Sequence, residues 1–365
     1  MTSSALPAAH PLVDGRTGDS ALVAALRGSR PAHRPVWFMR QAGRSLPEYL
    51  EARAGTGMLE SCLTPGLASE ITLQPVRRYG VDAAILFSDI VVPMRIAGVD
   101  VDIQPGVGPV FGRPVRTMAD VEALPALGVI GDRGSFDSGL DAIRSAVAIT
   151  VDELENVPLI GFAGAPFTLA AYMVDGRPSR DHMGARELMH SAPDVWDALV
   201  TWTSRAAGLF LRAQVLAGAS AVQLFDSWAG SLAESDYVAH CAAGSRTALM
   251  SVADLDVPRI HFAANAGHLL DAMGAAGATA LGVDYRTPLD AAARMTGGRF
   301  PLQGNIDPAM LAAPKDALAR HVKDVLARGA EAPGHVVNLG HGMPPHADPD
   351  VVKRIVDLVH EHGAA

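Results

Sequence analysis

Short runs of apolar and β-branched residues recur along this 365-residue chain, and stretches with helical periodicity separate them. A strand that is followed by a helix and then by another strand favours a parallel sheet, because the chain must cross back before it adds the next strand. Eight such runs predict an α/β fold whose sheet closes into a (β/α)8 TIM barrel. The predicted strands are residues 35–40, 83–87, 158–162, 221–225, 259–263, 278–283, 300–303 and 335–339.

The remaining segments fit around this barrel as one domain. The chain length would also suit two average domains, but the number of strands favours a single barrel over residues 19–365, preceded by a flexible tail over residues 1–18. Residues 94–116 are rich in Gly and Pro and alternate in polarity, which predicts a hairpin insertion after the second strand. A predicted helix begins at Thr64 and Pro65 and ends at Gly80.

Charge and hydropathy limit the partners of the chain. The net charge is −9, so the overall electrostatic field would repel nucleic acid. The first residues lack a basic stretch followed by an apolar one, and the longest nearly apolar run, 161–174, is shorter than the roughly 20 residues that span a bilayer. We therefore expect a cytoplasmic protein without nucleic-acid or membrane partners.

Residue usage also limits cofactor chemistry. Cys62 and Cys241 are too few for a disulfide framework or a thiolate metal cluster. The only lysines lie on predicted surface helices near the end of the chain, at positions 315, 323 and 353. No lysine follows a predicted strand, where a Schiff base with a substrate or with pyridoxal phosphate would need one.

Polar residues follow almost every predicted strand. Active sites of such barrels are built at the carboxyl ends of the strands, so these positions predict a polar cup over one end of the barrel. Taken singly, each is ordinary loop composition. The residues are Arg40, Ser88, Asp89, Asp226, Ser227, Asn265, Asp284, Asn305, Asp307, Asn338 and His341.

Arg40 and Arg44 lie four residues apart, directly after the first predicted strand and with Gly43 between them. Two fork-shaped guanidinium groups in one loop suit bidentate binding of carboxylates or phosphates. Two solvated surface arginines would have the same pattern, so these residues alone leave both interpretations open.

Asp89 and His341 are candidates for electrostatic or acid–base roles. Asp89 follows an apolar run and needs donors: it could cap a helix, pair with an arginine, or accept N–H groups from a ligand and stabilise a cation. His341 stands between Gly340 and Gly342, which would allow a ligand to approach the backbone closely. For an isolated histidine, a structural role is somewhat more common than a catalytic one.

Three other residues have structural alternatives. Tyr172 could belong to the core, Ser227 could cap the next helix, and His261 is interpreted as a barrel-lining residue. The glycines near residue 108 do not form a G-x-G-x-x-G motif that leads from a strand into a helix, so the sequence predicts no dinucleotide site.

The segment PVWFMRQAGRSLPEY resembles the signature of the uroporphyrinogen decarboxylase family, including its R-Q-A-G-R turn. The resemblance continues in order through LQPVRRYGVDAAILFSDI, GFAGAPFTLAAYMV, QLFDSWAG, LQGNIDP and NLGHG, as far as residue 342. It implies a TIM-barrel lyase that uses no metal or organic cofactor and forms a homodimer.

The resemblance implies a specific reaction. The four acetate side chains of uroporphyrinogen III become methyl groups, which gives coproporphyrinogen III in haem biosynthesis. Protonation of the pyrrole ring beside an acetate would supply the electron sink as carbon dioxide leaves. The proton donor stays open among Arg40, Tyr172, His341 and a substrate carboxyl, because arginine, with a pKa above about 12, is a poor acid.

The resemblance also implies roles for individual residues. The arginines would meet carboxylates, and Asp89 would contact the pyrrole N–H groups and stabilise the cation. The residues implied to bind substrate are Arg40, Gln41, Ala42, Gly43, Arg44, Asp89, Tyr172, Ser227 and His341, and those implied in catalysis are Arg40, Asp89, Tyr172 and His341. Tyr285, where the family often has tryptophan, and the loops at 177–182 and 343–350 depart from the expected pattern.

Two other functions share parts of this pattern. A zinc-dependent methyltransferase of the same superfamily would need His and Cys ligands at strand ends, which neither cysteine supplies. A non-catalytic tetrapyrrole-binding protein could keep the fold and the arginines, and the presence of Asp89 argues against it.

Overall fold

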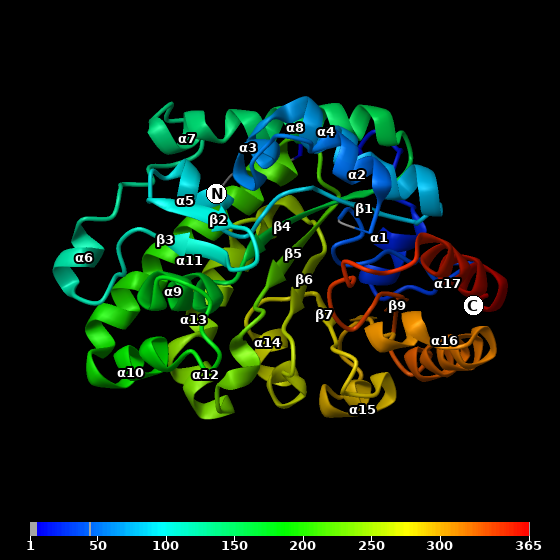
Figure 1. Cartoon of the computed structure of the whole chain (residues 1–365). Coiled ribbons are helices and arrows are strands. Elements are labelled where there is room, and N and C mark those ends of the chain that lie inside the picture. Colours follow the sequence, from blue (N-terminus) through cyan, green and yellow to red (C-terminus); the bar gives the residue numbers. More distant parts are fainter. Residues whose placement is uncertain (1–5, 44, 365) are drawn as a thin grey trace.

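The computed structural model describes residues 6–43 and 45–364. In these residues seven parallel strands form one sheet, in the order β1-β4-β5-β6-β7-β8-β9. Figure 1 shows the strands curled about a common axis with helices outside them. The strands are β1 (Ala84–Ile85), β4 (Leu159–Gly164), β5 (Ala221–Phe225), β6 (Arg259–Phe262), β7 (Ala280–Gly282), β8 (Leu302–Gln303) and β9 (His335–Val336).

Residues 35–39 close the sheet between its two edge strands. Val36 forms a parallel bridge with Val337. The Val337 N–H donates to the carbonyl of Pro35 (2.8 Å), and the Asp82 N–H, just before β1, donates to the carbonyl of Val36 (2.9 Å). The predicted TIM barrel is therefore confirmed, with its first strand shortened to a single bridge.

The first strand is short because its later N–H groups bond to side chains instead of a neighbouring strand. The Phe38 N–H donates to Gln41 Oε1 (3.0 Å), and the Met39 N–H donates to Asn338 Oδ1 (2.9 Å). These two acceptors satisfy buried backbone donors that a longer ladder would otherwise satisfy. The backbone is then free to turn at Arg40.

Helices surround the sheet, and in the described residues none is both long and apolar enough to cross a membrane. The α-helices are α1 (Ala21–Leu26), α2 (Pro47–Ala52), α3 (Met58–Leu63), α4 (Pro65–Tyr79), α5 (Val92–Ile96), α6 (Met118–Glu122), α7 (Ser135–Gly139), α8 (Asp141–Leu154), α9 (Pro166–Asp175), α10 (Met183–Ser191), α11 (Pro193–Leu216), α12 (Glu234–His240), α13 (Ala242–Met250), α14 (Leu270–Ala275), α15 (Leu289–Met295), α16 (Lys315–Gly329) and α17 (Pro349–His362). The 3-10 helices are η1 (Ala229–Ser231), η2 (Ala253–Leu255), η3 (Gly267–Leu269) and η4 (Pro308–Ala312).

Helix α4 begins and ends at the predicted residues. Pro65 occupies the first helical position, where its missing N–H has no intrahelical partner to lose. Gly80 ends the helix in the left-handed region, at φ +66°. The side chain of Thr64 does not cap the helix, because its hydroxyl donates to the carbonyl of Glu60 (2.9 Å) in the preceding turn.

An antiparallel ribbon of β2 (Val101–Gln104) and β3 (Gly108–Phe111) lies between β1 and β4 in the sequence. Its end is fixed to α9, because the Phe111 N–H donates to the carbonyl of Gly176 (2.8 Å) and the Val115 N–H donates to that of Met173 (2.9 Å). This attachment brings the Phe111 ring to the ring of Tyr172 on α9.

The segment before α1 packs against the barrel in the described residues. His10 and Thr17 are both buried. The His10 ring bonds to the carbonyl of Val215 (2.9 Å), and the Thr17 and Ser220 hydroxyls bond to each other (2.8 Å). A flexible tail over residues 1–18 stays a prediction, and residues 1–5 lie outside the described range.

A chain of side-chain hydrogen bonds crosses the barrel interior. Trp37 Nε1 donates to Gln303 Oε1 (3.1 Å), and Gln303 Nε2 donates to Gln223 Oε1 (2.9 Å). All three side chains are buried. A donor or acceptor that loses its partner here has no water to replace it.

We expect Gln303→Leu to lower the free energy of unfolding by about 2–4 kcal/mol, because leucine keeps most of the volume but leaves the Trp37 N–H and the Gln223 carbonyl unpaired. Urea denaturation measures the loss. The exposed Gln104→Leu serves as the control and should change stability by less than about 0.5 kcal/mol. Equal effects of the two substitutions would contradict the interpretation.

Candidate active site

Arg40 lies at the carboxyl end of the barrel, on the turn that follows residues 35–39. Its backbone is left-handed (φ +61°) and its side chain is exposed. A non-glycine residue in this region costs on the order of 1–3 kcal/mol and persists only where the surroundings enforce it. The enforcing bonds flank it: the Gln41 N–H donates to Phe38 O (3.0 Å), and the Met343 N–H donates to Met39 O (2.8 Å).

The other residues of the R-Q-A-G-R turn shape it. Gln41 is fully buried: its amide oxygen accepts from Phe38, and its Nε2 donates to the carbonyl of Ala83 (3.1 Å) beside β1. Ala42 and Gly43 are half-buried in the turn. Arg44 lies outside the described residues.

Asp89 follows β1 and faces the same end of the barrel. Its Oδ1 accepts the Val91 N–H (3.0 Å), which holds the carboxylate in a local turn. Desolvation raises the pKa of Asp89, while the Val91 N–H and the charge of Arg40 act in the opposite direction. Within residues 6–43 and 45–364, Asp89 Oδ2 accepts no hydrogen bond, so one carboxylate oxygen can meet a ligand donor.

Tyr172 on α9 belongs to an aromatic group that the sequence reveals only in part. Its ring lies 3.9 Å from that of Trp228 and 6.4 Å from that of Phe111, measured between centroids. The His182 ring stacks on the ring of Trp228, with 4.1 Å between the two centroids. Desolvation raises the pKa of Tyr172, and the charge of Asp89 adds to the rise. The hydroxyl therefore stays protonated at neutral pH and can donate a hydrogen bond.

Ser227 is held in the loop after β5 by its two neighbours. Thr168 on α9 donates to the carboxylate of Asp226 (2.8 Å), and the Trp228 N–H donates to the Thr168 hydroxyl (3.4 Å). Ser227 itself is half-buried. Among the described residues no side chain caps η1, so the alternative role of Ser227 as a helix cap does not hold there.

His341 is exposed on the loop after β9, and the glycines on either side of it allow other parts of the chain to pack closely there. A Cβ on Gly342 would lie 2.7 Å from Cδ of Arg40, and one on Gly340 would collide with the backbone of Tyr285. Partial desolvation, followed by the charges of Arg40 and Arg286, lowers the pKa of His341. The imidazole is therefore neutral at pH 7 in the free protein.

Arg286 is a functional candidate that the sequence did not suggest. It follows β7 and is half-exposed, with its guanidinium 4.3 Å from the ring centre of Tyr285. Its Nη1 donates to Asp284 (2.7 Å), which is buried. The signal was available: an arginine two residues after a strand-end aspartate is in reach of the barrel mouth.

Most of the other polar residues predicted at strand ends support loops. Asp284 accepts the N–H of Asn265, and Asn305 Nδ2 donates to the carbonyl of Asp284 (2.9 Å). Asp307 caps η4 by accepting the Ala309 N–H (2.9 Å). The polar cup thus divides into side chains whose bonds are used within the protein and a smaller group that keeps capacity for a ligand.

Arg40, Asp89 and His341 belong to this smaller group at the carboxyl end of the strands, and Tyr172 joins them from α9. The other three side chains lie close enough to Arg40 for its charge to shift their pKa values. They come from four different loops and helices, separated by up to about three hundred residues of sequence. A cation, a carboxylate, a phenol and a neutral imidazole at one barrel mouth can bind a polyanion and stabilise a positive charge within it.

The model of the family described as uroporphyrinogen decarboxylase (URO-D) matches residues 17–362. The chain is 60% identical to a uroporphyrinogen decarboxylase of Arthrobacter sp. (strain FB24), over 95% of this chain and 99% of that one. It is 56% identical to another of Leifsonia xyli subsp. xyli, over 99% of each chain. The chain belongs to the uroporphyrinogen decarboxylase family.

A structural comparison agrees on the fold. A methyltransferase from Methanosarcina mazei superposes with a TM-score of 0.78 over 94% of this chain and 98% of that one, at 18% identity. This likeness concerns the barrel alone. The thiols here do not favour zinc-thiolate chemistry, because Cys62 and Cys241 are buried and desolvation raises the pKa of each.

We predict that Arg40→Gln raises the pKa of both Asp89 and His341, because the lost positive charge lowers both values in the wild-type protein. NMR titration of the two side chains in the free protein measures the change. Arg286→Gln is a matched control: it removes a charge that acts on His341 but is not among the causes of the Asp89 shift. It should therefore raise the pKa of His341 only. Unmoved values in Arg40→Gln would contradict the proposed coupling.

Proposed function

We propose that this chain decarboxylates the four acetate side chains of uroporphyrinogen III to methyl groups, giving coproporphyrinogen III in haem biosynthesis. The chain carries the family's matched segments over nearly its whole length. The single observation that supports the chemistry is the Asp89 carboxylate, partly desolvated and within the field of Arg40, with one oxygen available in the described part of the site.

In the proposed reaction, one proton replaces each carbon dioxide. Protonation of the pyrrole ring beside an acetate makes the ring cationic. The bond between the acetate methylene and its carboxylate then breaks, its electron pair enters the ring, and carbon dioxide leaves. A proton on the resulting methylene gives the methyl group, and the ring carbon returns its proton.

Asp89 stabilises the cation in this proposal. Its available oxygen accepts pyrrole N–H groups, which become more acidic and more positive as the ring is protonated. Desolvation disfavours the charged form of Asp89 in the free protein, and it also strengthens the attraction between the carboxylate and a nearby cation. The ionised carboxylate therefore becomes favourable once the cation forms beside it.

Arg40, Arg44 and the neighbouring turn bind the peripheral carboxylates. Guanidinium groups hold carboxylates in bidentate geometry, and the enforced backbone of Arg40 limits the entropy lost on binding. We assign Gln41, Ala42 and Gly43 to the shape of this turn, and Tyr172, Ser227 and His341 to hydrogen bonds with the substrate. The candidate proton carriers are Arg40, Tyr172, His341 and a substrate carboxyl. Of the three side chains, His341 gains protons most readily when carboxylates bind nearby.

We also propose that the enzyme acts without metal or organic cofactor, in the cytoplasm, as a homodimer. Symmetric dimers are the commonest assembly of soluble proteins. Sedimentation of the purified protein tests the dimer, and a single species with the mass of one chain would contradict it. Turnover that disappears on treatment with a chelator while the thermal midpoint stays unchanged would contradict the cofactor assignment.

We expect Asp89→Asn to lower kcat by about a hundredfold or more while leaving binding of coproporphyrinogen measurable, because the substitution removes charge but keeps shape. The measurement is an anaerobic assay with uroporphyrinogen that follows the partly and fully decarboxylated products by chromatography. Exposed Asp316→Asn is the control and should keep wild-type turnover. Unchanged turnover in Asp89→Asn would remove this carboxylate from the mechanism.

A further inference from the structure

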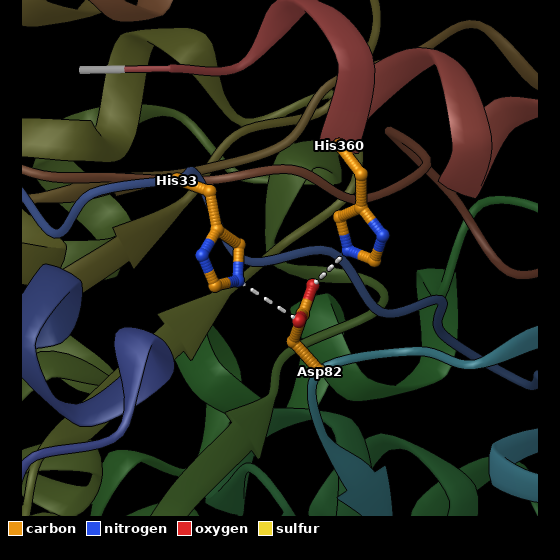
Figure 2. A group of neighbouring side chains, drawn as sticks. All are labelled: His33, Asp82 and His360. Atoms are coloured by element: carbon orange, nitrogen blue, oxygen red, sulfur yellow. Dashed lines mark hydrogen bonds and ion pairs between the residues drawn. The ribbon is translucent and has the colours of Figure 1, made fainter.

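His33, Asp82 and His360 meet at the end of the barrel opposite the candidate active site (Figure 2). His33 and Asp82 precede the segments 35–39 and β1, so both lie at amino ends of strands. His360 belongs to the last turn of α17. No step of the proposed reaction uses these residues.

The last described residues and the segment that enters the barrel bring this group together. His33 pairs with Ala364 in an antiparallel bridge, and the Arg34 N–H donates to the carbonyl of Gly363 (2.9 Å). The last residues therefore run beside the segment that enters the barrel. This pairing carries the end of α17, with His360, over Asp82.

Figure 2 shows both imidazole rings directed at the same carboxylate. His33 Nε2 lies 3.2 Å from Asp82 Oδ1, and His360 Nε2 lies 2.9 Å from Asp82 Oδ2. One candidate ligand atom from each residue lies within 4.8 Å of the other two. Four ligands at about 2.0–2.2 Å from a tetrahedral ion are themselves roughly 3.3 Å apart, so the three side chains need only small movements to surround an ion.

The carboxylate is fixed before any ion arrives. Asp82 Oδ2 accepts the Val36 N–H (2.8 Å), and the Asp82 N–H donates to the carbonyl of Val36. A ligand oriented by a backbone hydrogen bond is typical of protein metal sites. The side chains of His33 and His360 remain 45% and 38% exposed, so an ion can enter from solvent.

We propose that His33, Asp82 and His360 bind a divalent transition-metal ion of the zinc class, with water completing a four-coordinate site. Two imidazole nitrogens and a carboxylate oxygen suit Zn²⁺ and Co²⁺ better than the all-oxygen sites of Mg²⁺ and Ca²⁺. The ion would join the segment entering the barrel, the residue before β1 and the end of α17. Its role is structural, since the donors lie at the end of the barrel where stability rather than catalysis is usually located.

The test is a titration of the chelator-treated full chain with Co²⁺, whose visible absorption reports coordination, followed by calorimetry with Zn²⁺. We expect one ion per chain in each experiment, and a rise in the thermal midpoint as Zn²⁺ is added. His33→Ala and His360→Ala should each weaken binding at least tenfold, since even partners outside the ligand set cost about 10–100-fold. Asp82→Asn, which keeps an oxygen acceptor for Val36, provides a third variant whose fold is preserved.

His190→Ala is the matched control. His190 also faces an aspartate, with its Nε2 3.5 Å from Asp236 Oδ2, and its ring lies 5.7 Å from that of His240. In the described residues that group does not bring three ligand atoms within 4.8 Å. Binding should be unchanged in this variant. Wild-type affinity in both His33→Ala and His360→Ala, or equal loss in His190→Ala, overturns the proposal. Neither result bears on decarboxylation, because binding and the thermal midpoint are measured without substrate.

Discussion

The closure of the barrel at residues 35–39 is the constraint on which both ends of the molecule depend. A parallel sheet of seven strands leaves two edges, and one short segment must satisfy both. It does so with few ladder bonds, through the carbonyls of Pro35 and Val36 and the N–H of Trp37, and gives its other N–H groups to side chains. A longer strand would close the sheet equally well, but it would carry the backbone past the point where Arg40 now turns into the left-handed region.

The position of Arg40 in turn sets the electrostatics of the barrel mouth. Its charge lowers the pKa of Asp89, Tyr172 and His341. For Asp89 and Tyr172 this opposes the stronger effect of desolvation, and for His341 it acts in the same direction as desolvation. In the proposed reaction the substrate is a polyanion whose carboxylates pair with this guanidinium and offset its field. The pKa of all three neighbours would then rise together. Substrate binding would therefore favour proton uptake at the site, in the direction that a decarboxylation consuming one proton per carbon dioxide requires.

The sequence predicted the barrel, and it indicated most residues of the candidate site, because strands and strand ends follow from local patterns. Short apolar runs marked the strands, and polar residues directly after them marked the carboxyl end, since strand direction alone places them there. The sequence could not separate supporting side chains from those available to a ligand. Asn338 and Asp284 follow strands just as His341 does, yet the amide oxygen of Asn338 and both carboxylate oxygens of Asp284 accept hydrogen bonds within the protein. That distinction depends on contacts between residues far apart in the chain, as does the stacking of His182 on Trp228 from a loop whose sequence departs from the family pattern.

The same short segment also connects the proposed ion site at one end of the barrel with the candidate active site at the other. Its amino end begins at His33, beside the last residues of the chain, and its carboxyl end leads to Arg40. Asp82 contacts both this segment and the two histidines. Its N–H and carboxylate form hydrogen bonds with the backbone of Val36, and the same carboxylate pairs with His33 and His360. An ion held there would tighten the closure without approaching the mouth. Because the left-handed turn at Arg40 persists only while the closure enforces it, stability added at the amino ends would help preserve the geometry at the carboxyl ends.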